Sequence, residues 1–131
     1  MVKIEDLDIK DGIDADFANL KTTDKLNVYG VYVIYDPENL EVIYIGSAYA
    51  RTIKVRLTQY LNATDTGNTL AKSIAKRKYK CKVSKLTKDQ LKDAVKQIET
   101  YKIKAIKHED LEYKLINNAK PKYNNNGKGE D

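Results

Sequence analysis

The sequence predicts a single domain of α/β (α+β) class, in which a small three-stranded antiparallel sheet is flanked by helices. Three observations lead to this fold class. Runs of β-branched and aromatic residues are interspersed with helical patterns, a turn sequence joins the first two runs, and the length of 131 residues suits one compact core. A hydrophobic fraction of 41% is sufficient to form that core.

The first two strands are expected to pair as a hairpin. Residues 28–35 (VYGVYVIY) carry no charge and are rich in β-branched and aromatic side chains, as buried strands are. Turn-forming residues follow at 36–39 (DPEN), and residues 41–46 (EVIYIG) are expected to form the return strand. A third strand is expected at 79–86, where apolar residues alternate with lysine and serine and where Cys81 would be buried.

Helices are predicted where apolar residues recur every three to four positions. They are expected at 51–61, from Thr69 to the basic residues ending at Lys78, from Thr87 through Ile98, and at about 108–118. Thr87 and Gln90 match the pattern of a capping box. The polar loop 62–68 separates the first two helices, and Pro121 stops the last one.

The two ends of the chain differ in composition from the central domain, which is assigned to residues 28–124. Residues 1–27 are acidic and are expected to form short helical or irregular structure packed on the domain. Residues 125–131 are polar and are expected to be a flexible tail. The acidic start does not resemble a signal peptide, and no apolar run approaches the roughly 20 residues of a membrane span. A cytoplasmic protein without membrane contact is therefore expected.

The charge distribution favours a polyanionic partner. The formal net charge is +5, and a run of basic residues extends from Lys72 to Lys88 with no acidic residue within it. This run can contact a nucleic acid backbone or can be ordinary solvated surface, since its members fall on different faces of the predicted elements. With one cysteine and one histidine, the chain cannot build a zinc cluster of these ligands or a disulfide framework.

Four short segments occur in a characteristic order. Gly30-Val31-Tyr32 lies on the first predicted strand, and Tyr44-Ile45-Gly46 lies on the second. Arg56-Leu57-Thr58-Gln59-Tyr60 lies on the first helix, and the segment 112–124 (EYKLINNAKPKYN) begins with a glutamate and ends with an asparagine. Together these segments resemble the motifs of the GIY-YIG nuclease superfamily, which includes the nuclease domain of the excinuclease C subunit and the GIY-YIG homing endonucleases.

The resemblance implies a metal-dependent DNA endonuclease that hydrolyses phosphodiester bonds. Tyr32 would act as the general base, Arg56 would contact the phosphate, and Glu112 would hold Mg²⁺, for which Mn²⁺ can substitute. Tyr44 and Tyr60 would hydrogen-bond the phosphate or a metal-bound water. Free tyrosine has a pKa of about 10, so an alkaline activity optimum is expected.

The resemblance also implies residues that support the site and bind the substrate. Asn124 would position the catalytic groups. Contacts with the substrate are expected from Gly30, Gly46 and Ser47 of the two strand motifs and, on the basis of the basic run rather than of the resemblance, from Lys72, Lys76 and Arg77. Ser47 stands where the family often has lysine. The interval from Tyr44 to Arg56 is about two residues longer than usual in the family, so Arg51 and Lys54 are alternatives for the arginine role.

The expected partner is DNA, and sequence specificity would come from a partner protein, from homo-oligomerisation or from loops such as 62–68. The resemblance indicates a bacterial or phage origin. Two alternatives remain open. One is a non-catalytic nucleic-acid-binding module on the same fold, and the other is a small basic RNA-binding domain of ribosomal type.

Overall fold

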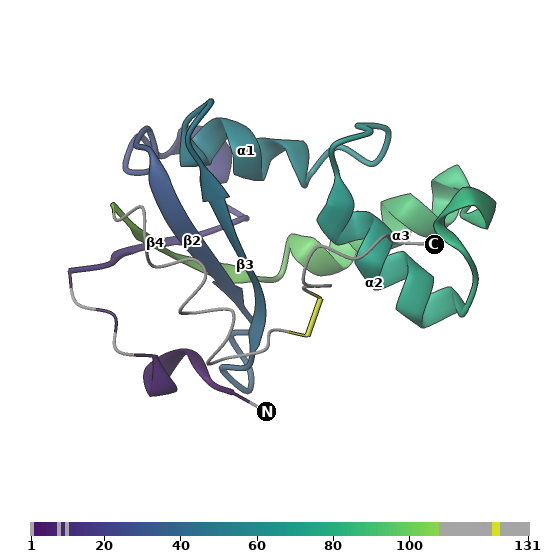
Figure 1. Cartoon of the computed structure of the whole chain (residues 1–131), viewed down its shortest axis with the longest axis horizontal. Coiled ribbons are helices and arrows are strands. Elements are labelled where there is room, and N and C mark those ends of the chain that lie inside the picture. Colours follow the sequence, from purple (N-terminus) through teal and green to yellow (C-terminus); the bar gives the residue numbers. More distant parts are fainter. Residues whose placement is uncertain (1, 8, 10, 108–121, 124–131) are drawn as a thin grey trace.

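A computed structural model describes residues 2–7, 9, 11–107 and 122–123 of the chain (Figure 1). This part contains a four-stranded antiparallel sheet and three α-helices, so the predicted α+β fold class is confirmed. The strands are β1 (Ile13–Asp16), β2 (Gly30–Tyr35), β3 (Val42–Ala48) and β4 (Lys102–Ile106). The helices are α1 (Ile53–Gln59), α2 (Thr69–Tyr79) and α3 (Lys88–Ile98), with short 3₁₀ turns η1 (Ile4–Asp6), η2 (Leu20–Thr22) and η3 (Val83–Lys85).

The sheet has the order β1-β4-β2-β3, with every neighbouring pair antiparallel. The predicted hairpin is present as β2 and β3, and β4, the last strand of the described residues, inserts between β1 and β2. Strand β2 is therefore paired on both sides, which explains why its uncharged sequence is buried almost throughout. Within this register Tyr32 lies opposite Gly46 on one side and Ala105 on the other.

The third strand predicted at 79–86 is wrong. Helix α2 continues through Tyr79, and Lys80 takes the left-handed conformation that ends it, with a φ of 52°. The following residues form η3, and Cys81 is only partly buried. The apolar alternation is present in this segment, but none of the strands in the described part of the chain pairs with it. The pairing strand is β4, where Ile103 and Ala105 are buried and alternate with lysine.

The acidic N-terminal segment contributes more regular structure than was expected of it. Strand β1 pairs with β4 at the edge of the sheet, which the sequence pattern did not indicate. Further upstream, Val42 donates its backbone N–H to the carbonyl of Val2, and Ile4 donates to the carbonyl of Leu40. This stretch covers the sheet face opposite α1, where Val2, Ile4 and Ile9 pack on a small apolar cluster.

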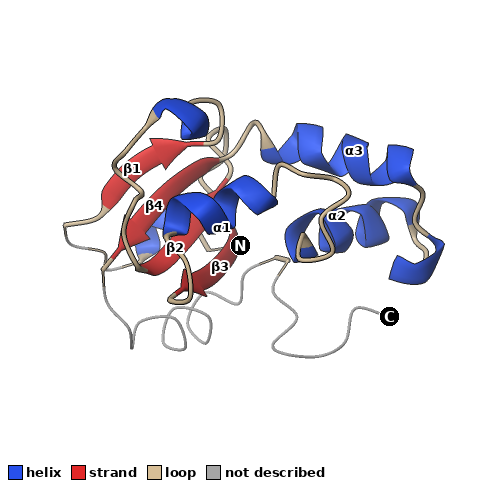
Figure 2. Cartoon of the chain, turned by 90° about the horizontal axis from the view of Figure 1, so that it is seen from above, coloured by secondary structure: helices blue, strands red, loops and turns tan. Residues whose placement is uncertain are grey.

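The helices form the other layer of the molecule. Helix α1 lies across one face of the sheet, while α2 and α3 pack side by side next to it (Figure 2). The capping box predicted at Thr87 and Gln90 is present at the start of α3. The helices predicted at 51–61, 69–78 and 87–98 are confirmed within one or two residues. The helix predicted at about 108–118 and Pro121 lie outside the described residues. Across the described ranges, none of the helices is long and apolar enough to span a membrane.

Candidate active site

Helix α1 brings its arginine and the tyrosine that follows it to the sheet. Thr52 caps the helix by accepting a hydrogen bond from the backbone N–H of Val55. Ile53 donates its backbone N–H to the carbonyl of Val28, which ties the first turn to the start of β2. Ile53 and Leu57 then point into the core and are fully buried. The spacing of these anchors directs Arg56 and Tyr60 towards β2 and β3.

Three tyrosines gather at this point. The hydroxyls of Tyr32 and Tyr60 form a buried hydrogen bond of 2.6 Å. The ring of Tyr60 meets the rings of Tyr32 and Tyr44 edge to face, with centroid distances of 6.1 and 5.9 Å. Tyr32 and Tyr60 are buried, whereas Tyr44 is half-buried. Tyr44 is therefore the tyrosine of the three that solvent or a ligand reaches most readily.

Gly46 makes room for the first of these tyrosines. A Cβ atom built on Gly46 would lie 2.4 Å from the Tyr32 hydroxyl oxygen, which no side chain tolerates. Gly30 has a different constraint, since its φ is 153° and an added Cβ would lie 2.1 Å from the carbonyl oxygen of Ile106. Both glycines predicted to contact substrate thus have a packing role in the protein itself. Their contact with substrate stays a prediction.

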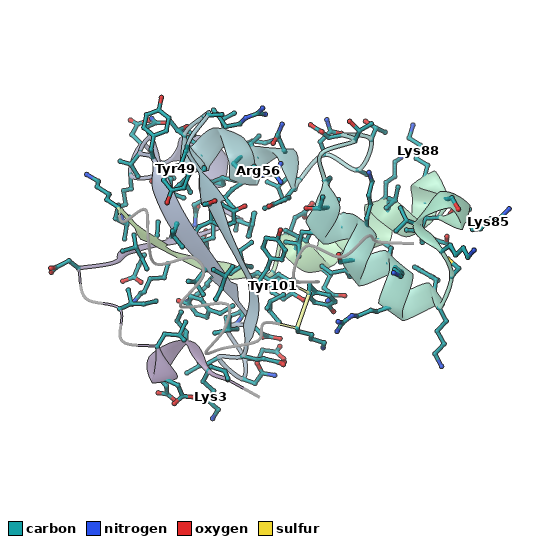
Figure 3. All side chains as sticks on the ribbon, in the orientation of Figure 1. Lys3, Tyr49, Arg56, Lys85, Lys88 and Tyr101 are labelled. Atoms are coloured by element: carbon teal, nitrogen blue, oxygen red, sulfur yellow. The ribbon has the colours of Figure 1, made fainter. Side chains whose placement is uncertain are left out.

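Arg56 extends from α1 (Figure 3) and lies against the ring of Tyr60. Its guanidinium carbon sits 4.8 Å from the centre of the Tyr60 ring. Its Nη1 donates to Oε1 of Gln59 at 2.8 Å and to the carbonyl of Gly67 at 3.1 Å. Burial acts to lower the pKa of Arg56, but the adjacent Tyr60 and Tyr32 outweigh it and the pKa is raised. The site therefore presents a permanently charged, oriented guanidinium.

The other two basic candidates for the arginine role lie elsewhere. Arg51 is exposed before the start of α1. The Nζ of Lys54 lies 3.9 Å from a carboxylate oxygen of Asp24. The structure therefore places Arg56 in the cluster and leaves Arg51 and Lys54 outside it.

Burial changes the acidity of the two inner tyrosines. It raises the pKa of Tyr32 well above the ordinary value of 10.0, and neighbouring Tyr44 adds to the rise, while the hydrogen bond from Tyr60 and the charge of Arg56 oppose it. The pKa of Tyr60 is raised for the same principal reason. Both phenols hold their protons at neutral pH. This works against the phenolate that a general base at Tyr32 requires.

The C-terminal part of the candidate site is represented by one anchored residue. Glu112 and Asn124 lie outside the described residues. Tyr123 is buried, and its backbone N–H donates to the carbonyl of Ile43 at 2.9 Å. The guanidinium of Arg77 stacks over the Tyr123 ring at 5.3 Å. The chain thus returns to β3 beside Tyr44 immediately before the position of the predicted asparagine.

The remaining predicted substrate contacts are spread over the molecule. Ser47 pairs with Val31, whose side chain packs on the sheet face away from α1. Lys72 donates to the carbonyl of Thr66 at 2.8 Å. Lys76 and Arg77 lie further along α2, on a basic face that they share with Lys80, Cys81 and Lys82. Arg77 is eight residues into the helix, about 12 Å along its axis from Thr69. The residues that line this basic face do not include Tyr32, Tyr44 or Tyr60.

Two further groups belong to the site and were not singled out from the sequence. Gln59 bonds Arg56 directly, and its position three residues later on the same helix is a signal that indicates such contact. The Gly67 carbonyl comes from the 62–68 loop, which the sequence predicted as a helix break and as a source of sequence specificity but not as a contact of Arg56. Because every residue has a backbone carbonyl, the sequence does not indicate which carbonyl will accept this hydrogen bond.

Comparison with known proteins gives one match. The family model described as the GIY-YIG catalytic domain matches residues 28–124, most of the chain. No curated protein and no solved structure gave a significant match.

Proposed function

Since the chain belongs to the GIY-YIG catalytic domain family, whose members are endonucleases, we propose that it hydrolyses DNA phosphodiester bonds at the Arg56 and tyrosine cluster. Family membership supports nuclease-type activity in general. The proposal adds the substrate, DNA, the dependence on a metal ion, and the catalytic set of Tyr32, Tyr44, Arg56, Tyr60, Glu112 and Asn124.

The observation that carries the proposal is the oriented guanidinium of Arg56, which lies over the buried ring of Tyr60, and Tyr60 in turn contacts the half-buried Tyr44. Hydrolysis of a phosphodiester builds negative charge on the phosphate oxygens, and a planar cationic fork stabilises that charge through paired hydrogen bonds. Because Gln59 and Gly67 already hold one nitrogen of the guanidinium, little reorganisation is needed when the phosphate arrives. Tyr44 is the adjacent hydroxyl best placed to contact the same phosphate.

Tyr32 keeps the role of general base in this proposal, with a requirement that follows from its burial. Its proton is held tightly in the substrate-free protein, because burial raises its pKa. Proton removal therefore requires added positive charge near the oxygen, which Arg56 supplies in part. A reaction that uses this base should accelerate with pH through the neutral range and beyond.

The metal ion is proposed on Glu112 from the family resemblance. Among the residues that the structure describes, no three acidic, histidine or cysteine side chains gather as a metal site. Mg²⁺ commonly binds through one or two carboxylates and keeps several waters, so a single glutamate is compatible with it. When bound, Mg²⁺ supplies positive charge at the phosphate and the leaving oxygen.

The test is nicking of supercoiled plasmid by the purified protein with Mg²⁺, Mn²⁺ or EDTA. Glu112→Gln is compared with wild type, and Glu38→Gln, an exposed glutamate in the β2–β3 turn, is the matched control. Wild type and Glu38→Gln should nick with either metal and not with EDTA, and Glu112→Gln should lose about 100-fold or more of the rate. If the protein binds plasmid and branched DNA but cuts neither, the endonuclease proposal is refuted and a non-catalytic binding module takes its place.

A further inference from the structure

We infer that Gln59 and the 62–68 loop act as positioning elements for Arg56, holding its guanidinium in the orientation that phosphate binding requires. The inference rests on the proposed function, because it assigns the two elements to the same site. It concerns residues that contact the arginine and not the reacting phosphate.

The contacts at Arg56 define the orientation of the group. The Nη1 nitrogen has two hydrogens, and it has two acceptors, Oε1 of Gln59 at 2.8 Å and the carbonyl of Gly67 at 3.1 Å. The ring of Tyr60 supports one side of the guanidinium, with the ring centre 4.8 Å from the guanidinium carbon. With Nη1 occupied in this way, the guanidinium can turn its Nε and Nη2 hydrogens towards the tyrosines and a phosphate.

The loop acceptor is itself held in place by a buried side chain. Asn68 is 1% exposed, and its Nδ2 donates to the carbonyls of Tyr60 and Asn62 at 3.0 and 2.9 Å. Its Oδ1 accepts from the backbone N–H of Ala71 at 3.0 Å and caps α2. One amide therefore connects the end of α1, the loop and the start of α2. This explains why the loop is compact although its composition is that of a flexible connector.

Two more hydrogen bonds fix the tip of the loop. Asp65 accepts from the backbone N–H of Gly67 at 2.7 Å, which sets the peptide that follows. Lys72, from the first turns of α2, donates to the carbonyl of Thr66 at 2.8 Å. These hydrogen bonds fix the backbone of the loop, and the loop in turn presents the carbonyl of Gly67 to Arg56.

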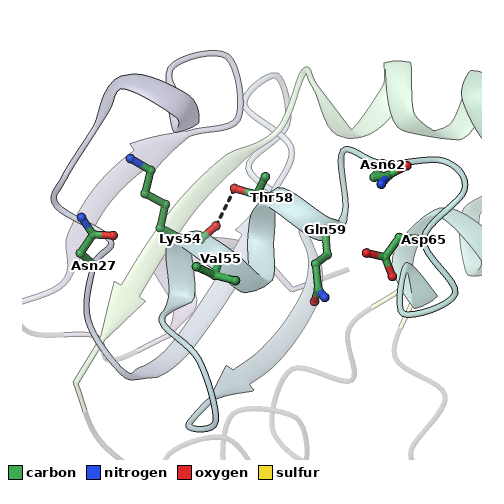
Figure 4. A pocket seen from close by; sticks show the side chains of 7 residues that line it. All are labelled: Asn27, Lys54, Val55, Thr58, Gln59, Asn62 and Asp65. Atoms are coloured by element: carbon green, nitrogen blue, oxygen red, sulfur yellow. Dashed lines mark hydrogen bonds between the residues drawn. The ribbon is translucent and has the colours of Figure 1, made fainter.

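Gln59 is suited to substitution because it is at the surface. It lines an open pocket of about 450 Å³ together with Val55, Thr58, Asn62 and Asp65 (Figure 4). Replacing its amide by a nonpolar group of the same length therefore creates no closed cavity. The change Gln59→Met removes the acceptor, while Gln59→Glu keeps one. Thr58→Val is the matched control, because Thr58 lines the same pocket and its hydroxyl bonds the carbonyl of Lys54 instead.

The functional test is a double-mutant cycle in single-turnover DNA nicking. Gln59→Met should lower the rate at saturating protein by about 10-fold or more, with apparent DNA affinity changed less than about twofold. Gln59→Glu should recover most of the rate, and Thr58→Val should match wild type. In an Arg56→Ala background Gln59→Met should have no further effect, because its role acts through the arginine. An equal fold loss in both backgrounds would overturn the inference.

A second measurement separates this inference from the proposed function. The Arg56 side chain is observed by NMR in ¹⁵N-arginine-labelled protein without DNA. Wild type should show separate, slowly exchanging Nη1 hydrogens, and these should average in Gln59→Met and persist in Thr58→Val. Identical spectra for wild type and Gln59→Met would refute the positioning role. Failure of wild type to cut any DNA would refute the endonuclease proposal and leave this spectroscopic result standing on its own.

Discussion

The hydroxyls of Tyr32 and Tyr60 lie 2.6 Å apart in the protein interior and share one hydrogen bond. The bond joins the middle of β2 to the C-terminal end of α1, and its two residues are 28 positions apart in the chain. Each phenol satisfies the other, which allows two polar groups to be buried without leaving either unpaired. The pair also supports the ring on which Arg56 rests. The core and the candidate site are therefore built from the same side chains.

The first prediction concerns stability at high pH. Burial raises the pKa of Tyr32 and Tyr60 above the ordinary value of 10.0. Below pH 10 the folded and unfolded chains both hold these protons, so the groups add no pH dependence. Above pH 10 the unfolded chain releases them first, so the free energy of unfolding should fall as pH rises. Urea unfolding between pH 8 and 11 measures this fall.

Tyr32→Phe should reduce that alkaline fall without abolishing it, because it removes one group of the buried pair and leaves other tyrosines with a raised pKa, such as Tyr101, in place. It should also cost about 1–3 kcal/mol at pH 8, since the Tyr60 hydroxyl loses its partner. Tyr29→Phe is the control, because Tyr29 is 56% exposed. A Tyr32→Phe protein with the same alkaline fall as wild type would show that the buried pair is not its origin.

The second prediction is that Gly46→Ala destabilises the protein through Tyr32. The added methyl group would lie 2.4 Å from the Tyr32 hydroxyl oxygen and 2.6 Å from the ring carbon that carries it. The tyrosine must move within a packed core, which costs about 1–3 kcal/mol in free energy of unfolding. The loss should be smaller in a Tyr32→Phe background, where the nearest atom is absent. An equal loss in both backgrounds would place the strain elsewhere.

Local patterns predicted the elements whose partners are close in sequence. The hairpin of β2 and β3 has its turn chemistry between the strands, and α3 has its capping box at Thr87. Strand β4 was not predicted, although Lys102–Ile106 alternates as clearly as residues 79–86 do. Alternation makes a segment suitable for a strand, but pairing decides whether it becomes one. The partners of β4 are β1 and β2, far away along the chain, and the local pattern contains no information on them.

The same distinction applies to the site. The motif residues Tyr32, Tyr44, Arg56 and Tyr60 could be named from the sequence because their types and spacing are characteristic, and the structure brings their side chains together. The carbonyl of Gly67 could not be named, because any residue has one and its direction depends on the loop. The sequence predicted that Tyr32 lies on a buried strand, but the packing of α1 over it, which completes its burial, is not visible in the local pattern.

The third prediction separates two roles of Asn68. Asn68→Asp keeps an oxygen that can cap α2 but loses the two hydrogen bonds donated to the carbonyls of Tyr60 and Asn62. Those carbonyls would then face a carboxylate, so the free energy of unfolding should drop by about 2 kcal/mol or more. Denaturant unfolding measures the drop. Asn62→Asp, at an exposed position of the same loop, is the control for the change in charge. Equal effects of the two substitutions would contradict the structural role of Asn68.

The fourth prediction concerns the basic face of α2. If Lys76 and Lys80 contact DNA phosphates, the double substitution to glutamine should weaken binding equally for all sequences. The slope of log affinity against log salt concentration should fall by about 0.9 for each lost contact. Lys3→Gln is the control, because Lys3 lies at the other end of the molecule from α2 and α3 (Figure 3). An unchanged slope in the double variant would mark this face as solvated surface.

The most direct measurement of the central claim compares wild type, Arg56→Lys and Arg56→Ala in Mg²⁺-dependent plasmid nicking, with DNA binding measured in parallel. The guanidinium of Arg56 is held by Gln59, Gly67 and the Tyr60 ring, and an ammonium cannot reproduce its planar fork. Both substitutions should lower the cutting rate by about 100-fold or more while DNA affinity changes only a few-fold. An Arg56→Ala protein that cuts as fast as wild type would contradict the assignment of this cluster as the catalytic centre.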